Sequence, residues 1–123
     1  SYSQTVYLAS EINANGDISD IQWYYSGTSA LPSSQELVIY MAELPRTEFA
    51  STTDWEPIAS FTEVYSGGIT VTAGVEGWVT LTLDTPFTYA GTGNLVIAVE
   101  ENGADYDDAG DDFYNSQVTT NSE

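Results

Sequence analysis

The sequence contains no cysteine, histidine or lysine, and its only basic residue is Arg46. The chain therefore offers no thiol nucleophile, no amine for a Schiff base and no ordinary general base that titrates near neutral pH. It also lacks the nitrogen and sulfur ligands that zinc prefers. Paired carboxylates can cleave glycosidic bonds, but nothing singles out one pair among the 19 acidic residues. The sequence predicts that this protein is not an enzyme.

The scarcity of positive charge excludes whole classes of partner. With 19 acidic residues against one arginine, the net charge is −18. Nucleic acids and anionic membrane surfaces are bound through Lys and Arg, so neither is an expected partner. Most carboxylates must be solvated or bind cations, because few can form salt bridges within the chain. Such a surface is screened by salt and keeps a protein soluble, which predicts an extracellular or cell-surface location.

Long apolar runs are also missing. No stretch of about 18 apolar residues occurs, so no membrane insertion is expected. The 123 residues fit a single domain, 1–123, and a hydrophobic content of 41% predicts a folded globule. Because cysteine is absent, core packing or bound ions must stabilise it.

What the chain does contain is a series of short apolar segments, separated by turn residues and spaced about ten residues apart. Residues 36–42 and 94–100 are apolar on both faces, which predicts central strands. A last strand is expected at residues 113–118. The pattern predicts an all-β fold, an antiparallel β-sandwich of jelly-roll or immunoglobulin/fibronectin-like topology with at most one short helical turn.

Three further local features are predicted. Residues 61–66 and 69–72 indicate a hairpin around the intervening glycines. Proline at position 45, followed by helix-tolerant residues, predicts a helical turn within residues 45–52. Trp55, which follows that turn, is expected in the core because large aromatic side chains dominate core energetics.

Two segments alternate strictly between apolar and polar side chains. The side chains predicted to face the core are Ile21, Trp23 and Tyr25 from the first segment and Val79, Leu81 and Leu83 from the second. Those predicted to face outward are Asp20, Gln22, Tyr24, Trp78, Thr80 and Thr82.

Several segments carry a resemblance to a known class of module. They are YSQTVYLASEI, GDISDIQWYY, LVIYMAEL, TDWEPI and, most specifically, GWVTLTLDTPFTYAGTGNLVIAVEEN. Over residues 2–102 the chain resembles β-sandwich modules of secreted bacterial surface proteins, the adhesin-like multidomain proteins of type IX secretion. The resemblance implies adhesion or glycan binding and carries no catalytic residue. Such modules continue into further strands, whereas here an acidic segment follows.

That acidic segment predicts a cation site. Within a stretch containing glycine, five closely spaced aspartates offer the oxygen ligands that Ca²⁺ prefers, although the spacing does not match an EF-hand. The predicted ligands are Asp105, Asp107, Asp108, Asp111 and Asp112. The alternative is a solvated acidic loop, which is what charge runs usually are.

Exposed aromatic side chains predict a second kind of site, because sugars stack on Trp and Tyr rings. The candidates for glycan contact are Trp78, Tyr24, Tyr89 and Tyr106. The alternative is that these rings cover sheet edges or pack under loops.

Assembly is the third possibility. Residues 102–123 are expected to form a loop plus a last strand, or a strand exchanged with a neighbour. We therefore expect a non-catalytic extracellular structural or adhesive module, with self-association or neighbouring domains as partners, as in a surface filament or stalk. The alternative is a carbohydrate-binding module appended to a polysaccharide-degrading enzyme.

Overall fold

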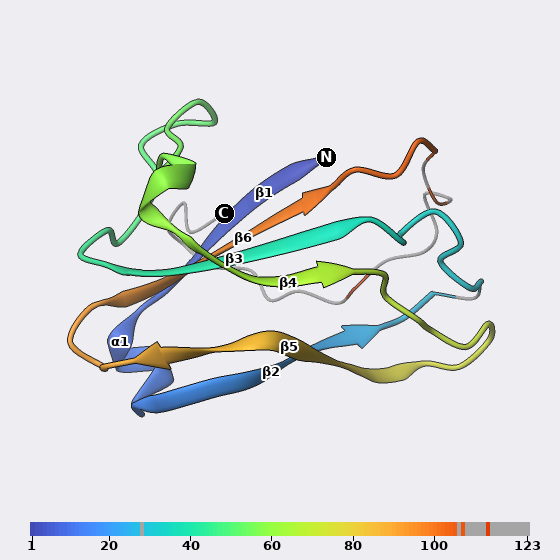
Figure 1. The fold of residues 1–123 in the computed structure, drawn as a ribbon, viewed down its shortest axis with the longest axis horizontal. Helices are drawn as coiled ribbons and strands as arrows, with labels where there is room; N and C mark the ends of the chain where they lie inside the picture. Colours follow the sequence, from blue (N-terminus) through green and yellow to red (C-terminus); the bar gives the residue numbers. More distant parts are fainter. Residues whose placement is uncertain (28, 106, 108–112, 114–123) are drawn as a thin grey trace.

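The computed structural model describes residues 1–27, 29–105, 107 and 113 (Figure 1). About half of these residues form strands, all of them in two antiparallel sheets, which confirms the predicted all-β sandwich. The elements are β1 (Tyr2–Tyr7), α1 (Ala9–Ile12), β2 (Gly16–Tyr25), β3 (Leu37–Leu44), the 3₁₀ turn η1 (Ile58–Ser60), β4 (Thr62–Gly67), β5 (Gly77–Tyr89) and β6 (Asn94–Glu101).

The two sheets differ in size. One sheet has the strand order β1-β6-β3-β4, and the other contains β2 and β5 alone. Figure 1 shows the pair β2–β5 as a separate layer from the larger sheet. The backbone N–H of Ser66 in β4 donates to the Asp84 carboxylate of β5 at 2.9 Å, so the two layers are linked on that side. Because the smaller sheet has two described strands against four and lies on the β4 side, it does not cover the inner face of the larger sheet at β1.

The main core lies between the two layers. Ile39 and Met41 of β3 are fully buried against Leu81 and Leu83 of β5, with Val64 of β4 beside them. Burial of each such side chain contributes about 1.5–3 kcal/mol. The strict alternation of β5 therefore has the predicted result, since its apolar side chains point inward and Thr80 and Thr82 stay exposed.

Strand β5 runs further than its alternating segment predicted. Its pairing with β2 is interrupted between Ile18 and Asp20, which pair with Phe87 and Thr82. Pro86 lies within the extra β5 residues, where the missing N–H of proline does not break a ladder bond. The irregularity lets β5 continue to Tyr89 despite its proline.

A second, smaller hydrophobic cluster lies on the outer face of β1 and β6. Val6 and Val96 are buried there under Phe49, and Leu8, Leu44 and Phe61 pack against them. Residues 45–61 thus form a loop that covers the outer face of the larger sheet.

The helical turn predicted within residues 45–52 is wrong. This segment is irregular, and the helical turns among the described residues are α1 and η1. The reason is the Asp54 carboxylate, which accepts a hydrogen bond from the Ala50 N–H at 2.9 Å and two more from Arg46. These bonds satisfy the loop without a helix. In α1, by contrast, the Glu11 carboxylate accepts the Leu8 N–H at 2.7 Å and caps the turn.

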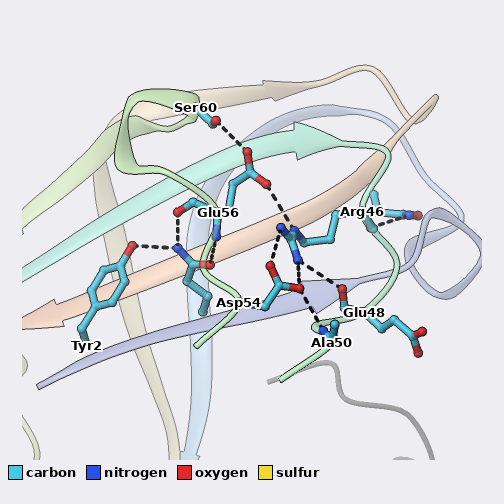
Figure 2. A network of polar contacts seen from close by, with 9 residues as sticks. Tyr2, Arg46, Glu48, Ala50, Asp54, Glu56 and Ser60 are labelled. Atoms are coloured by element: carbon cyan, nitrogen blue, oxygen red, sulfur yellow. Dashed lines mark hydrogen bonds and ion pairs between the residues drawn. The ribbon is translucent and has the colours of Figure 1, made fainter. Parts of the chain in front are cut away.

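Arg46 organises this loop (Figure 2). Its guanidinium donates to both oxygens of Asp54, at 2.9 and 3.2 Å, and through Nε to Glu56 at 3.2 Å. The hydrogen bonds from Arg46 lower the pKa of Asp54, and the same bonds raise the pKa of Arg46. The only basic side chain of the chain thus forms ion pairs with two carboxylates of one loop.

Gln4 connects the loop to β1. Its side chain is only 2% exposed, and its amide donates to the Glu56 carbonyl at 2.9 Å and accepts from the Glu56 N–H at 2.9 Å. It also donates to the Tyr2 hydroxyl (Figure 2). A buried amide left unpaired would be costly, so these bonds fix the loop against the strand.

The hairpin predicted from residues 61–66 and 69–72 is also wrong. Strand β4 pairs with β3, and residues 69–72 form no strand. The Ile69 N–H donates to the Ser34 carbonyl at 3.0 Å, and its carbonyl accepts from the Gln35 amide at 3.1 Å. Because the loop before β3 takes both backbone groups of Ile69, they are not available to β4.

Trp55 lies outside the core, contrary to prediction. Its side chain is 47% exposed and its ring packs against Tyr2, with centroids 5.2 Å apart. The neighbouring Glu56 is held by Gln4 and Arg46, so the chain at this point runs over the surface. Trp23 does pack against the main core, as its position predicted.

No helix among the described residues is long and apolar enough to cross a membrane.

Candidate functional site

An apolar groove opens where the small sheet leaves β1 and β6 uncovered. We call this the open groove; its volume is about 260 Å³. Strand β1 contributes Ser3, Thr5 and Tyr7 to its lining. The remaining lining residues are Trp23, Ser34, Leu37, Ile69, Ile97, Val99 and Phe113.

The burial of β1 is inverted relative to that of β3. On β3 the side chains that face the interior, such as Ile39, are buried. On β1 the interior side chains Ser3 and Tyr7 are exposed, while Gln4 and Val6 on the opposite face are buried beneath the 45–61 loop. Within the part of the chain that the structure describes, β1 is therefore covered on its outer face and left partly uncovered on its inner face.

The same incompleteness affects β6 and β2. Ile97 and Val99 face the open groove and are only half-buried, although Ala98 between them is fully buried. Trp23 on β2 is half-buried as well. Apolar side chains that point inward yet remain accessible indicate that no strand among the described residues covers this side of the interior.

Phe113 lies at one end of this gap. It forms an antiparallel bridge with Tyr25, which also pairs with Gly77 of β5. Because a strand residue pairs on two sides, Phe113 lies on the edge of β2 that faces away from β5. Its ring centroid is 5.2 Å from that of Tyr25 and 6.2 Å from that of Trp23. Of the last strand predicted at 113–118, the other residues lie outside the described part of the chain.

Two of the predicted glycan-contact residues come together on the outer face of β2 and β5. Tyr24 and Trp78 are direct cross-strand partners, and their rings meet edge to face at 5.2 Å and 90°. Trp78 is 66% exposed. We call the surface formed by these two residues with Asp20, Gln22, Thr80 and Thr82 the Trp78 face.

The other two glycan candidates do not join the Trp78 face. Tyr89 is 2% exposed at the end of β5, where its hydroxyl donates to the Gly93 carbonyl at 2.6 Å. Burial raises the pKa of Tyr89. Its ring therefore supports the turn before β6 and is not accessible for stacking. Tyr106 lies outside the described residues.

The predicted calcium ligands are described only in part. Asp107 accepts hydrogen bonds from the Ser33 N–H at 3.1 Å and from the Ser34 hydroxyl at 2.7 Å. Asp105 is exposed. The residues outside the described part of the chain are Asp108, Asp111 and Asp112. Within the described ranges, no three or more acidic side chains are grouped so as to hold a metal ion.

Strand parity predicted the outward side chains of β2 and of β5 separately, but the sequence predicted neither their union in the Trp78 face nor the open groove. The groove depends on which strands pair across long sequence separations, such as β1 with β6. The one available signal was the opening segment YSQTVY, in which alternation places Gln4 beside Val6 on the face that proves to be buried.

Comparisons of the chain with protein families, with curated protein sequences and with solved structures gave no match.

Proposed function

We propose that this chain is a non-catalytic extracellular structural or adhesive module that accepts an extended segment of a neighbouring chain in the open groove. The observation that carries the proposal is the exposure of inward-facing side chains along β1 and β6. An added strand beside β2 would lie over Thr5, Ile97 and Val99. Donation of a strand to an incomplete sheet is an established mode of assembly.

The edge of β2 that faces away from β5 is where such a strand would be added. Among the described elements β2 pairs with β5 along one edge, and the bridge to Phe113 lies on its other edge. The edge of a sheet is a template for another extended chain. Phe113 shows that this edge accepts an antiparallel partner at Tyr25, next to the open groove.

The sequence that follows Phe113 offers the groove an alternate set that is only partly apolar. Side chains alternate along a strand, so an apolar groove calls for apolar residues at every second position. After Phe113 one alternate set is Asn115, Gln117 and Thr119, and the other is Tyr114, Ser116 and Val118. Polar side chains would lose hydrogen bonds to water in this groove. A more apolar segment from a neighbouring chain therefore suits it better.

The charge of the chain makes assembly depend on salt. Two copies that each carry a charge of −18 repel each other in dilute salt. At physiological ionic strength, salt largely screens the repulsion between charges that are more than about 8 Å apart. Assembly through the open groove is therefore expected to strengthen as salt is added, which suits an extracellular setting and the resemblance to surface modules.

The absence of cysteine permits a direct test. The variant Thr5→Cys places the only thiol of the chain in the open groove, and Thr72→Cys places it in an exposed loop as a matched control. We expect sedimentation to show larger species as protein and salt concentrations rise. In parallel, labelling at position 5 should slow while labelling at position 72 stays unchanged. A monomer at every concentration, or equal labelling of both thiols, would refute the proposal.

A further inference from the structure

Trp78 is the most exposed large apolar side chain among the described residues, at 66%. It stands on a strand, where backbone hydrogen bonds to β2 fix its position, and not on a loop. The edge-to-face contact with Tyr24 restricts its rotation and leaves a broad indole face toward solvent. A rigid, exposed aromatic plane is suited to stacking against a flat ligand.

Polar side chains continue the Trp78 face along both strands. The Gln22 amide donates to the Thr80 hydroxyl at 2.8 Å, and the Thr82 hydroxyl donates to Asp20 at 2.7 Å. These cross-strand bonds hold the side chains in place. Gln22 uses one N–H in its bond, so its carbonyl oxygen and second N–H can bond a ligand. From Trp78 to Thr82 the row extends about 13 Å, at the usual rise of a strand.

This combination favours a sugar over a protein partner. The core of a protein interface is usually a cluster of apolar side chains from which charge is depleted. On the Trp78 face a single exposed aromatic ring is followed by hydroxyl, amide and carboxylate groups. A pyranose ring presents a flat C–H face for stacking and hydroxyl groups for such polar side chains.

The negative charge of the chain disfavours acidic sugars as ligands of the Trp78 face. Asp20 belongs to the face itself, and Asp17 accepts a hydrogen bond from Thr88 farther along the same two strands. With a net charge of −18, the chain repels uronic acids and sulfated sugars. We propose that the Trp78 face binds a neutral polysaccharide, with one sugar ring stacked on Trp78 and its neighbours hydrogen-bonded to Gln22, Thr80 and Thr82.

Isothermal titration calorimetry with soluble oligosaccharides tests this site. The probes are β-1,4-linked glucose, xylose and mannose oligomers and α-1,4-linked glucose oligomers, with oligogalacturonate as the acidic comparison. We expect at least one neutral oligomer to bind and the acidic one to give no heat. The variant Trp78→Ala should weaken binding about tenfold or more through loss of the stacked ring.

Trp55→Ala is the matched control. Trp55 is also exposed and also packs on a tyrosine, with the same 5.2 Å centroid distance, but it lies outside the Trp78 face. Its removal should leave the affinity unchanged. Circular dichroism checks that each variant folds, and Gln22→Ala gives a second reading that keeps both rings. Silence across all neutral probes, preference for the acidic oligomer, or equal affinity of Trp78→Ala and wild type would each overturn the proposal.

Discussion

Phe113 pairs with Tyr25 across the edge of β2 that faces away from β5. The two residues are far apart in the sequence, yet their rings lie 5.2 Å apart. Asp107 contributes to the same arrangement, because its bonds to Ser33 and Ser34 attach the preceding chain to the loop before β3. The acidic segment is thus anchored at two points beside the open groove.

Replacement of Phe113 tests this anchoring. Phe113→Ala removes a half-buried ring that packs on Tyr25 and Trp23, and we expect a loss of about 1–2 kcal/mol in the free energy of unfolding. Urea titration measures the loss. Ile58→Ala, at a site 52% exposed, removes apolar volume without this packing and should cost much less. Equal effects of the two variants would contradict the anchoring role.

Lysine at position 46 is expected to stabilise the 45–61 loop less well than arginine does. Its guanidinium bonds both oxygens of Asp54 and one of Glu56, and an ammonium group lacks this planar fork. Arg46→Lys keeps the charge, yet its melting temperature should fall by a few degrees, measured by circular dichroism. A variant as stable as wild type would mean that charge alone holds the 45–61 loop.

The hydrogen bonds of Glu43 should make the stability of the fold depend on pH. Its carboxylate accepts the N–H groups of Gly93, Ala90 and Thr92, and these bonds lower its pKa. Because the folded pKa lies below the unfolded one, the stabilisation is complete above the unfolded value of about 4.3 and is lost as pH falls through the folded value. The melting temperature of Glu43→Gln should therefore fall below wild type near neutral pH, and the difference should shrink in acid.

The control for this pH profile is Glu63→Gln. Glu63 is an exposed residue on β4, so this change removes the same charge from the acidic surface. Its effect on the melting temperature should be small or slightly stabilising, because repulsion is reduced. If both variants follow the same profile, the three backbone bonds to Glu43 contribute nothing particular.

Salt is expected to stabilise the fold. Since the net charge is −18, added NaCl should raise the melting temperature by screening repulsion. CaCl₂ at matched ionic strength separates screening from a specific site. Equal shifts would indicate screening alone. A larger shift with CaCl₂, abolished by combined Asp108→Asn and Asp111→Asn changes, would support the calcium site predicted from the acidic segment.

Alternation predicted what depends on neighbours along the chain. It placed Trp78 and Tyr24 on the outward side of their own strands and Leu81 and Tyr25 on the inward side, because parity alone decides this once a strand forms. The position of Ile69 was not predictable in the same way. Its backbone bonds go to the loop at Ser34, and no local pattern announces a partner so distant in sequence.

The errors at residues 45–61 have a similar origin. A proline start and helix-tolerant residues predicted a helical turn within residues 45–52, but the bonds that shape the 45–61 loop come from Arg46 and from Gln4 on β1. Trp55 is exposed for the same reason, since Glu56 beside it is fixed to β1. The open groove likewise reflects unequal sheet sizes, which emerge only when all pairings are known.

The two hydrogen bonds between the Gln4 side chain and the backbone of Glu56 affect how the open groove would accept a neighbouring segment. These bonds hold the outer face of β1 in place. The inner face of the same strand, which carries Thr5, is therefore already ordered before a segment binds in the open groove. Binding to a surface that is already fixed loses less conformational entropy than binding to one that must first be immobilised. A single buried amide thus prepares the opposite side of its own strand for a partner.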